Sequence, residues 1–375
     1  MKGTALPPRD IPNDLWTFLG QTERPILLYG MGNGADKLIA RLALLGKEVA
    51  DVFASDGFVR GQLFHGKRVL SFSEAKEKYE APIILVSFGT ALSDVLQAIF
   101  AIEAEYELYV PDMPIAGDAY FTKDFYAENY DKFLRAYDIL ADDASKALYA
   151  NLLWYKLTGK PQYLRNAVKT GDERELLGYE RMRCAVDVGA YRGDTLAELL
   201  SYAPFLQTVF LLEPDVKNFK KLSAYAEGIG GKELILRHAA AWNENGILSF
   251  SSSGNRNATL DVDHLAGTAS FEHRTTAVEA VKIDDIMQGR MVDYIKYDTE
   301  GAEMAALLGS LETIESARPA LKVSVYHRSE DLFALPLLLW EKTENKYTYY
   351  LRRRLSIPAW DIELIAVPNN KERKE

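Results

Sequence analysis

A glycine-rich turn between a strand and a helix constrains the fold of this chain more than any other feature. Residues 183–188 (RCAVDV) are typical of a buried strand, and they run into the turn GAYRGDT at 189–195. Apolar residues at helical spacing follow the turn. A strand, a glycine turn and a helix in this order predict the first unit of a doubly wound parallel sheet.

Other apolar runs extend this prediction. We expect further strands of the second half at 208–212, 233–238, 292–297 and 321–326, then an antiparallel pair at 348–355 and 361–367. Earlier strand signals at 25–30, 48–53 and 82–87 alternate with helical patterns, which predicts a smaller parallel α/β unit. The predicted division is a Rossmann-like α/β domain at 1–120, a helical linker at 121–180 and a second α/β domain at 181–375.

Composition excludes several classes of protein. The formal net charge of -10 argues against a nucleic-acid partner, which normally requires a basic face. No run approaches the ~18 apolar residues of a membrane span, and we see no signal peptide. A single cysteine, Cys184, fits a reducing compartment, so a cytoplasmic location is expected. The only tight basic run, 352–354 (RRR), is interpreted as a solvated edge.

The first half carries a glycine turn of its own. GMGNGA at 30–35 follows a strand and fits the dinucleotide-binding pattern, and Asp56 lies near the end of the next strand, where a ribose-binding acid could sit. A turn of this kind is also kept for packing alone. A bound nucleotide and a purely structural turn therefore both stay open at this position.

The second glycine turn has a different spacing. Gly189 and Gly193 are four residues apart, which makes a wider loop that suits the aminoacid tail of S-adenosylmethionine, and the following helix N-terminus can receive a carboxylate. Glu213 ends the next strand and can accept the ribose hydroxyls. His238 ends another strand and could border the adenine. The predicted cofactor-binding residues are Asp187, Gly189, Ala190, Tyr191, Gly193, Asp194, Thr195, Glu213, Pro214, His238 and Asp298.

A cluster of carboxylates follows the strand at 292–297. The sequence DTEGAE at 298–303 places Asp298, Glu300 and Glu303 where a strand meets a helix. They could bind a metal, with Mg²⁺ the expected ion, position the sulfonium or remove a proton; helix capping is the structural alternative. His327 ends the next strand and is the candidate general base. Catalytic roles are predicted for His327, Asp298 and Glu300.

Five segments together resemble the FkbM-type methyltransferase family: DVGAYRGDT, LLEPD, VEAVKIDDI, VDYIKYDTEGAE and KVSVYH. The resemblance covers about 183–367. It implies a seven-stranded Rossmann-like sheet and an S-adenosylmethionine-dependent O-methyltransferase acting on sugar or polyketide hydroxyls. It also implies that Asp187, Gly189, Gly193 and Glu213 hold the cofactor, while the three carboxylates of the DTEGAE turn line the site.

The acceptor is less constrained than the cofactor. The first half resembles nucleotide-binding-like domains attached to carbohydrate-modifying enzymes, which favours a small-molecule or glycan acceptor; a homo-oligomer is left open. The polar segment 249–274 is a candidate acceptor lid. Two rival functions remain: a nicotinamide-dependent oxidoreductase that uses the first glycine turn, and a non-catalytic scaffold that keeps the methyltransferase fold.

Overall fold

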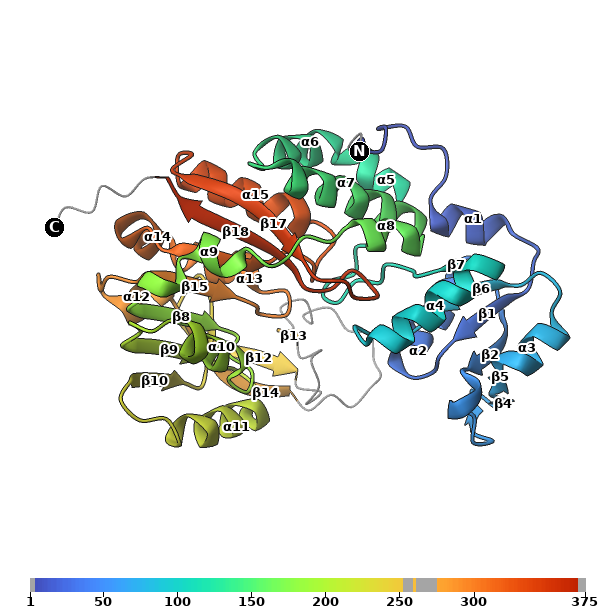
Figure 1. The fold of residues 1–375 in the computed structure, drawn as a ribbon, viewed down its shortest axis with the longest axis horizontal. Helices are drawn as coiled ribbons and strands as arrows, with labels where there is room; N and C mark the ends of the chain where they lie inside the picture. Colours follow the sequence, from blue (N-terminus) through green and yellow to red (C-terminus); the bar gives the residue numbers. More distant parts are fainter. Residues whose placement is uncertain (1–3, 252–258, 261–274, 370–375) are drawn as a thin grey trace.

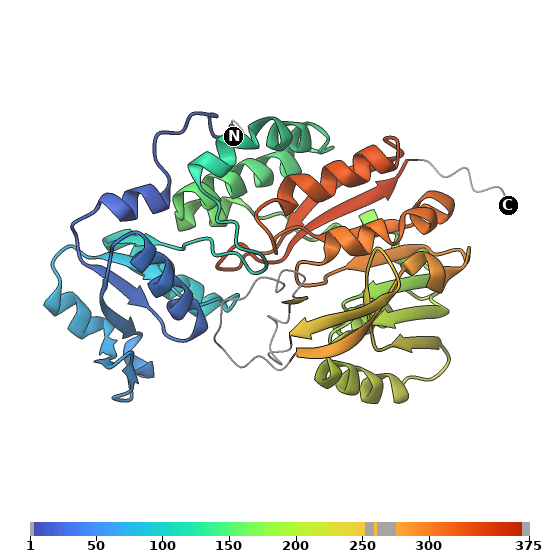
Figure 2. The ribbon, with the colours of Figure 1, turned by 180° about the vertical axis from the view of Figure 1, so that it is seen from behind.

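The computed structural model describes residues 4–251, 259–260 and 275–369. Two parallel-stranded sheets lie side by side, one built from the first 110 residues and one from the second half of the chain (Figures 1 and 2). A group of helices from the middle of the chain packs above the junction between them.

The N-terminal sheet has five parallel strands in the order β5-β2-β1-β6-β7. Taken in chain order this is 3-2-1-4-5, the arrangement of doubly wound sheets. The central strands β1 and β6 are buried at every position, as expected for a parallel sheet covered on both faces. The strands are β1 (Ile26–Tyr29), β2 (Val49–Ala54), β5 (Leu70–Ser71), β6 (Ile83–Val86) and β7 (Glu107–Tyr109).

Helices cover this sheet, and a short hairpin extends from it. The first helical turn of α3 is closed by a capping box, in which Ser71 and Glu74 each bond the other's backbone. The helices are α1 (Leu15–Gln21), α2 (Asn33–Leu44), α3 (Phe72–Lys78) and α4 (Ser93–Glu105), and the hairpin pairs β3 (Leu63–Phe64) with β4 (Lys67–Arg68).

The middle of the chain is helical, as the sequence predicts. Its longest helix, α7, begins after the N-cap Asp142 and ends at Gly159, which adopts the left-handed conformation. Most of its residues are buried, because α7 packs against α8 on one side and against β17 on the other. The helices are α5 (Lys123–Glu128), α6 (Tyr130–Asp138), α7 (Asp143–Thr158) and α8 (Pro161–Asn166), and β17 spans Tyr347–Arg353.

The C-terminal sheet has seven strands in the order β10-β9-β8-β15-β16-β18-β17. All are parallel except β18, which runs antiparallel to both of its neighbours. This confirms the predicted seven-stranded sheet with its terminal antiparallel pair. Besides β17, the strands are β8 (Cys184–Val188), β9 (Thr208–Leu212), β10 (Glu233–Arg237), β15 (Tyr294–Tyr297), β16 (Ala320–Ser324) and β18 (Ile362–Pro368).

In the described part of this half, seven helices accompany the sheet, and a second, smaller sheet follows β10. The helices are α9 (Glu173–Leu177), α10 (Asp194–Tyr202), α11 (Val216–Glu227), α12 (Ile283–Met287), α13 (Glu303–Leu308), α14 (Leu311–Ala317) and α15 (Asp331–Lys342). The small sheet joins β11 (Ala239–Ala241), β14 (Thr275–Val281), β12 (Gly246–Ser251) and β13 (Thr259–Leu260) in that order. Most of the segment expected to form an acceptor lid lies outside the described residues.

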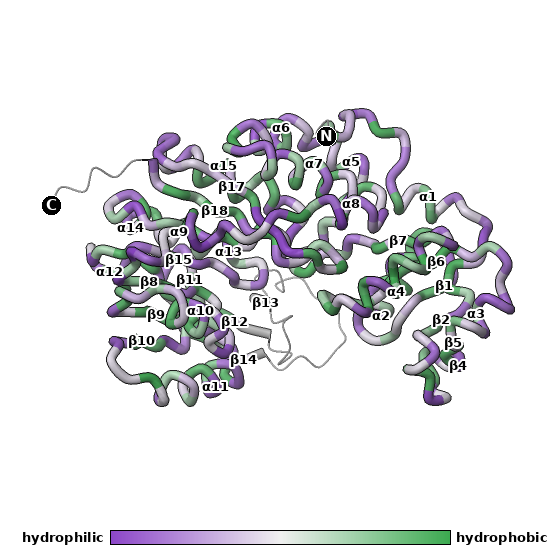
Figure 3. The backbone as a smooth tube through the Cα atoms, viewed as in Figure 1, coloured by the Kyte–Doolittle hydropathy of each residue, from purple (hydrophilic) through white to green (hydrophobic). Residues whose placement is uncertain are grey.

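Hydrophobic residues concentrate in the strands of both sheets, while polar residues dominate the loops (Figure 3). The basic run at 352–354 departs from this pattern, and its interpretation as a solvated edge is wrong for two of its three residues. The side chains of Arg352 and Arg353 are only 1% exposed. Arg353 donates to backbone carbonyls of Leu164, Ala167 and Ser356. These bonds fix the end of α8 against the loop after β17.

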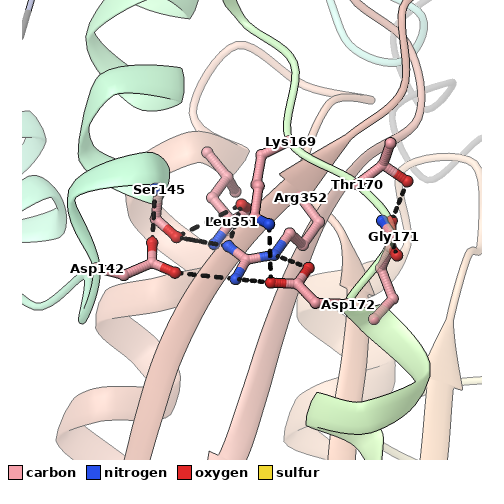
Figure 4. Close-up of polar contacts among 9 residues, drawn as sticks. Asp142, Ser145, Lys169, Thr170, Gly171, Asp172, Leu351 and Arg352 are labelled. Atoms are coloured by element: carbon pink, nitrogen blue, oxygen red, sulfur yellow. Dashed lines mark hydrogen bonds and ion pairs between the residues drawn. The ribbon is translucent and has the colours of Figure 1, made fainter. Parts of the chain in front are cut away.

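Arg352 joins three elements at one point (Figure 4). Its guanidinium bonds Asp172 twice, at 2.7 and 2.9 Å, and bonds Asp142 at 2.9 Å. It also donates to the hydroxyl of Ser145. Because Asp142 is the N-cap of α7 and Asp172 that of α9, this single side chain ties the starts of both helices to β17.

Candidate active site

A pocket opens at the carboxyl ends of β8, β9 and β15, where doubly wound sheets bind their ligands. The loop after each strand supplies part of its wall. Further residues come from the start of α11, from β11 and from the loop between β17 and β18. The lining residues are Val188, Gly189, Tyr191, Asp194, Glu213, Pro214, Asn218, Ala239, Ala240, Ala241, Lys296, Asp298, Thr299, Glu300, Tyr326 and Asp361.

The glycine turn packs tightly against the end of β15. Gly189 has a φ of +84°, and a Cβ there would lie 1.8 Å from the carbonyl oxygen of Asp298. A side chain at this position would push the two loops apart. Gly193 is held in a similar way against the ring of Tyr225. The glycines therefore bring the turn and the acidic loop together, which places Tyr191 and Asp194 on the wall of the pocket.

Glu213 has the position expected of a ribose acceptor. One carboxylate oxygen accepts from the backbone N–H of Tyr191 and the other from that of Asp215, both at 2.8 Å. Each oxygen keeps a second lone pair for a ligand hydroxyl. Burial raises the pKa of Glu213 to about 7, and the two backbone donors act in the opposite direction.

Asp187 lies beneath the pocket, outside its lining. Its side chain is completely buried, and neither carboxylate oxygen has a hydrogen-bond partner among the described residues. The ammonium of Lys296, on the neighbouring strand, is 3.9 Å away and also lies 3.2 Å from Asp298. Burial raises the pKa of Asp187 to about 6, although Lys296 opposes this shift. Lys296 thus links the buried acid to the acid at the pocket wall.

Asp298 is a carboxylate held in its charged form. It accepts a hydrogen bond from the hydroxyl of Ser324 at 2.9 Å. Burial by itself would raise its pKa, but the charges of Lys296 and His327 lower the pKa of Asp298 to about 2. Its neighbour Glu300 adopts a left-handed backbone conformation, with a φ of 54°.

His327 is locked behind these two carboxylates. Its Nδ1 lies 2.9 Å from Glu303, whose oxygens also accept the backbone N–H groups of Thr299 and Gly301. Its Nε2 faces Glu300 at 3.5 Å and Asp298 at 3.7 Å.

The histidine is fully buried and does not reach the pocket. Burial would lower its pKa, but Glu303 and the other two carboxylates raise the pKa of His327 to about 10. At neutral pH the ring is therefore an imidazolium, which cannot accept a proton. The atoms of Asp298, Glu303 and His327 lie close enough to share a metal ion, a grouping that includes His327 where the sequence prediction had Glu300.

The structure brings together about half of the predicted cofactor-binding and catalytic residues. Gly189, Tyr191, Asp194, Glu213, Pro214, Asp298 and Glu300 line the pocket. Asp187, Ala190, Gly193, Thr195, His238 and His327 do not, nor does Glu303, which was predicted as a metal ligand; His238 instead bonds the carbonyl of Pro214 and lies against the ring of Phe219 at a tilt. The lining residues that were not predicted are Val188, Asn218, Ala239 to Ala241, Lys296, Thr299, Tyr326 and Asp361. Asn218 had a usable signal, because it follows the LLEPD strand end at the start of a helix, whereas the alanines had none.

A second, strongly polar pocket adjoins the first. The two share Asp194, Lys296, Asp298 and Asp361. Eleven of its thirteen lining residues are ionisable, and the other two are glycine and threonine. The strands β15, β16 and β18 supply its floor through Lys296, Lys322 and Glu363. Residues 171–174, at the start of α9, supply one side. Such a surface suits a ligand rich in hydroxyl or charged groups.

The N-terminal half packs against the back of the acidic turn. The backbone N–H groups of Ile115 and Ala116 both donate to the carbonyl of His327, at 3.2 and 3.0 Å. A Cβ at Gly301 would lie 2.4 Å from that of Ala116, so the loop after β7 packs directly on the acidic turn. The two halves of the chain therefore meet at the candidate active site.

This sheet order, with the pocket at its strand ends, defines a methyltransferase-like fold. Residues 187–350, somewhat less than half of the chain, match the family model described as the methyltransferase FkbM domain. The chain is also similar to the crystal structure of methyltransferase FkbM from Methylobacillus flagellatus KT. The TM-score is 0.67 and the identity 21%, over 91% of this chain and 89% of the other. The shared fold thus extends through both halves.

Other solved structures resemble only about half of the chain. An rRNA methylase from Streptococcus thermophilus is 12% identical over 56% of this chain and 98% of its own, with a TM-score of 0.33. A putative rRNA-methylase from Clostridium thermocellum is 10% identical over 54% and 98%, also with a TM-score of 0.33. No curated protein sequence matches this chain. Within the described residues, no helix is long and apolar enough to cross a membrane.

Proposed function

We propose that this protein transfers a methyl group from S-adenosylmethionine to a hydroxyl of a sugar, a glycan or a related natural product. The observation that carries this proposal is the meeting of three features in one pocket: the Gly189 turn, the ribose-type acceptor Glu213 and the acidic pair Asp298 and Glu300. The match to the methyltransferase family model supplies the reaction type.

The residues present fit the cofactor. Glu213 offers one free lone pair on each oxygen for the two ribose hydroxyls. The three alanines of β11 contribute apolar surface to the pocket, which suits an adenine ring. When bound, S-adenosylmethionine supplies an activated methyl group, and the protein contributes mainly proximity and orientation, which can be worth about 7–11 kcal/mol.

The acceptor proton requires a base, and the geometry favours the carboxylates over the histidine. Asp298 and Glu300 lie between His327 Nε2 and the pocket, and each is about 30% exposed. They can accept the hydrogen bond of an acceptor hydroxyl. His327, protonated and held by Glu303, would stabilise their negative charge and share a proton with them. We therefore place His327 in a supporting role, with Asp298 or Glu300 nearest the reacting hydroxyl.

The adjoining polar pocket supports a polyhydroxylated acceptor. It shares a wall with the cofactor pocket through Asp298 and Asp361, so a ligand in it would reach the carboxylates. Its ionisable lining can exchange many hydrogen bonds with hydroxyl groups. An apolar polyketide surface would instead leave these charges without partners, at a cost in free energy.

The test combines a binding titration with a turnover assay. Calorimetry should detect S-adenosylmethionine binding, and Glu213→Gln should weaken it by about tenfold. Glu227→Gln, an exposed change on α11, is the matched control. Binding of NAD(P) in place of S-adenosylmethionine would refute the proposal.

Turnover is measured with labelled S-adenosylmethionine over a panel of glycans. Asp298→Asn should lower the rate by about 10²–10⁴-fold if this carboxylate serves as the base. Its cofactor affinity should change far less. A variant that keeps the wild-type rate would remove Asp298 from the mechanism.

A metal-assisted form of the same reaction, with Mg²⁺ on the acidic turn, makes a separate prediction. Lys296 and the imidazolium of His327 already neutralise part of the carboxylate charge. We therefore expect turnover to survive treatment with EDTA. Loss of activity with EDTA, restored by added Mg²⁺, would instead assign the acidic turn to metal binding.

A further inference from the structure

A separate cavity lies in the N-terminal half, at the first glycine turn. It opens at the carboxyl ends of β1, β6 and β7, and the sheet order changes direction between β1 and β6. Doubly wound sheets bind ligands at this switch point.

The walls combine one cation with aromatic rings. Lys37, on the second turn of α2, lines the cavity, and its ammonium lies 3.4 Å from the carbonyl oxygen of Pro114. Among the described residues it has no carboxylate within ion-pair distance, and burial lowers its pKa. A half-buried cation of this kind is stabilised by an anionic ligand. Phe88 and Trp360 provide ring surfaces in the same cavity.

The arrangement differs from the dinucleotide site that the sequence pattern suggested. Of the three glycines of the turn, only Gly34 lines the cavity, and a Cβ at Gly30 would lie 2.4 Å from the ring of Phe88. Asp56 does not line the cavity; it accepts hydrogen bonds from Ser73. An anion in this cavity would therefore sit beside Lys37, near the start of α2.

The cavity also borders the catalytic region. Pro114 and Ile115 line it, and the backbone of Ile115 bonds the carbonyl of His327. Trp360 lines it from the other half, and the next residue, Asp361, lines the candidate active site. In each of two loops, a residue that lines this cavity is followed directly by a residue beside the candidate active site: Ile115 by Ala116, and Trp360 by Asp361. A ligand held here would therefore lie close to the site of methyl transfer.

We propose that this cavity binds a nucleoside diphosphate group, with its phosphates at Lys37 and its base against Trp360. Any nucleobase can stack on an aromatic ring, whichever base it is. The phosphates supply the negative charge that Lys37 lacks. Such a group could be a free nucleotide or the activated end of a sugar acceptor. Only the second source rests on the proposed function.

The first experiment measures binding to the full chain without a methyl acceptor. Uridine, guanosine, adenosine and thymidine diphosphates are titrated by calorimetry in the presence of saturating S-adenosylhomocysteine. At least one should bind, and Lys37→Met should weaken it by about tenfold or more. Lys47→Met, which removes a charge just beyond the same helix, should bind as the wild type does. Lys37→Arg, which keeps the charge, should retain more affinity than Lys37→Met.

Two results would overturn the proposal: none of the four nucleotides binds, or Lys37→Met binds the nucleotide as tightly as the wild type does. Because S-adenosylhomocysteine already fills the cofactor site, a nucleotide that only used that site would not bind. Circular dichroism and S-adenosylmethionine titration of each variant check that it is folded. If the wild type does not bind S-adenosylmethionine, the proposed function is refuted, but the nucleotide result still stands.

The second experiment distinguishes the two sources. Nucleotide-activated sugars are tested as methyl acceptors. If the cavity holds the activated end of the acceptor, Lys37→Met should raise the acceptor KM and leave kcat nearly unchanged, and free diphosphate should compete with the acceptor. If the nucleotide is a separate effector, it should alter turnover of a glycan acceptor without competing with it.

Discussion

Three residues of the candidate site hold a backbone conformation that side chains disfavour. Tyr191, Glu300 and Asp361 all have φ between 49° and 55°, and all line the same pocket. Each such residue costs on the order of 1–3 kcal/mol and persists only where its surroundings enforce it. The three come from loops after different strands. Packing around the pocket therefore fixes the directions of these side chains before any ligand binds.

Glu213 should make cofactor binding depend on pH. Its raised pKa of about 7 means that it loses its charge as the pH falls below neutrality, and ribose hydroxyls bond the charged form better. We expect S-adenosylmethionine affinity to increase between pH 6 and pH 8 when measured by calorimetry. Glu213→Gln should show a flat profile. A wild-type affinity that is the same at pH 6 and at pH 8 would contradict this role.

His327 should make stability depend on pH in the alkaline range. Its folded pKa of about 10 lies above the ~6.5 of an unfolded chain, so its contribution is complete below about pH 6.5 and is lost as the pH rises through 10. Up to about 1.4 kcal/mol per pH unit should disappear between pH 7 and 10. Urea unfolding at a series of pH values gives the free energy of unfolding, which should fall more steeply with pH in the wild type than in His327→Gln. The same dependence on pH in both proteins would show that the histidine is not protonated in the folded protein.

At the scale of elements, one arginine holds two helix starts against a strand. The pKa values of Asp142 and Asp172 are both lowered, Asp172 chiefly by its hydrogen bonds to Arg352 and Asp142 by Ser145 and Arg352 against the effect of burial. Removing the guanidinium of Arg352 would leave Asp142 and Asp172 without their shared cation. The elements concerned, α7, α9 and β17, have few other polar links to one another among the described residues.

Arg352→Met should therefore destabilise the protein by about 3 kcal/mol. Arg354→Met, two residues on and exposed, should stay within about 0.5 kcal/mol of the wild type. Urea unfolding at pH 7 compares the two. Because the acids are stabilised in their charged form, the loss in Arg352→Met should shrink as the pH falls through their folded pKa values. Equal losses of unfolding free energy in the two variants would contradict the role of Arg352 and its two acids.

The strands and the site differ in how far sequence could predict them. The apolar run at 208–212 coincides with β9, because a buried parallel strand needs continuous apolar residues. Glu213 and Asp298 were predictable because polar residues at strand ends gather at one edge of the sheet. The burial of Arg352 was not, since its partners lie 180 and 210 residues away. Nor were the alanines of β11, whose apolar side chains carry no chemical signal.

At the scale of the whole molecule, the halves interlock through small residues. A Cβ at Gly89, after β6, would lie 2.1 Å from the ring of Trp360, which follows β17. Gly301 and Ala116 make a second close approach beside the acidic turn. The crystal structure of similar fold matches this chain over 91% of its length, so its fold includes counterparts of both halves.

A double-mutant cycle measures this interlocking. Gly89→Ala should cost about 1–3 kcal/mol, because the new methyl group overlaps the indole ring. In a Trp360→Leu background the same change should cost at least about 1 kcal/mol less. Thermal and urea unfolding give the four stabilities. Additive effects would show that Gly89 and Trp360 do not meet in solution.

The bonds from Ile115 and Ala116 to His327 connect main chain to main chain. They are therefore indifferent to which side chains the loop after β7 carries. Met113, Pro114 and Ile115 can be replaced without releasing the histidine, whereas Ala116 is confined by Gly301. The backbone of the loop after β7 thus holds His327, while its side chains line the N-terminal cavity. Substitutions in the loop can change the ligands that the N-terminal cavity admits while the reacting groups keep their places, which gives an enzyme of this architecture room to diversify.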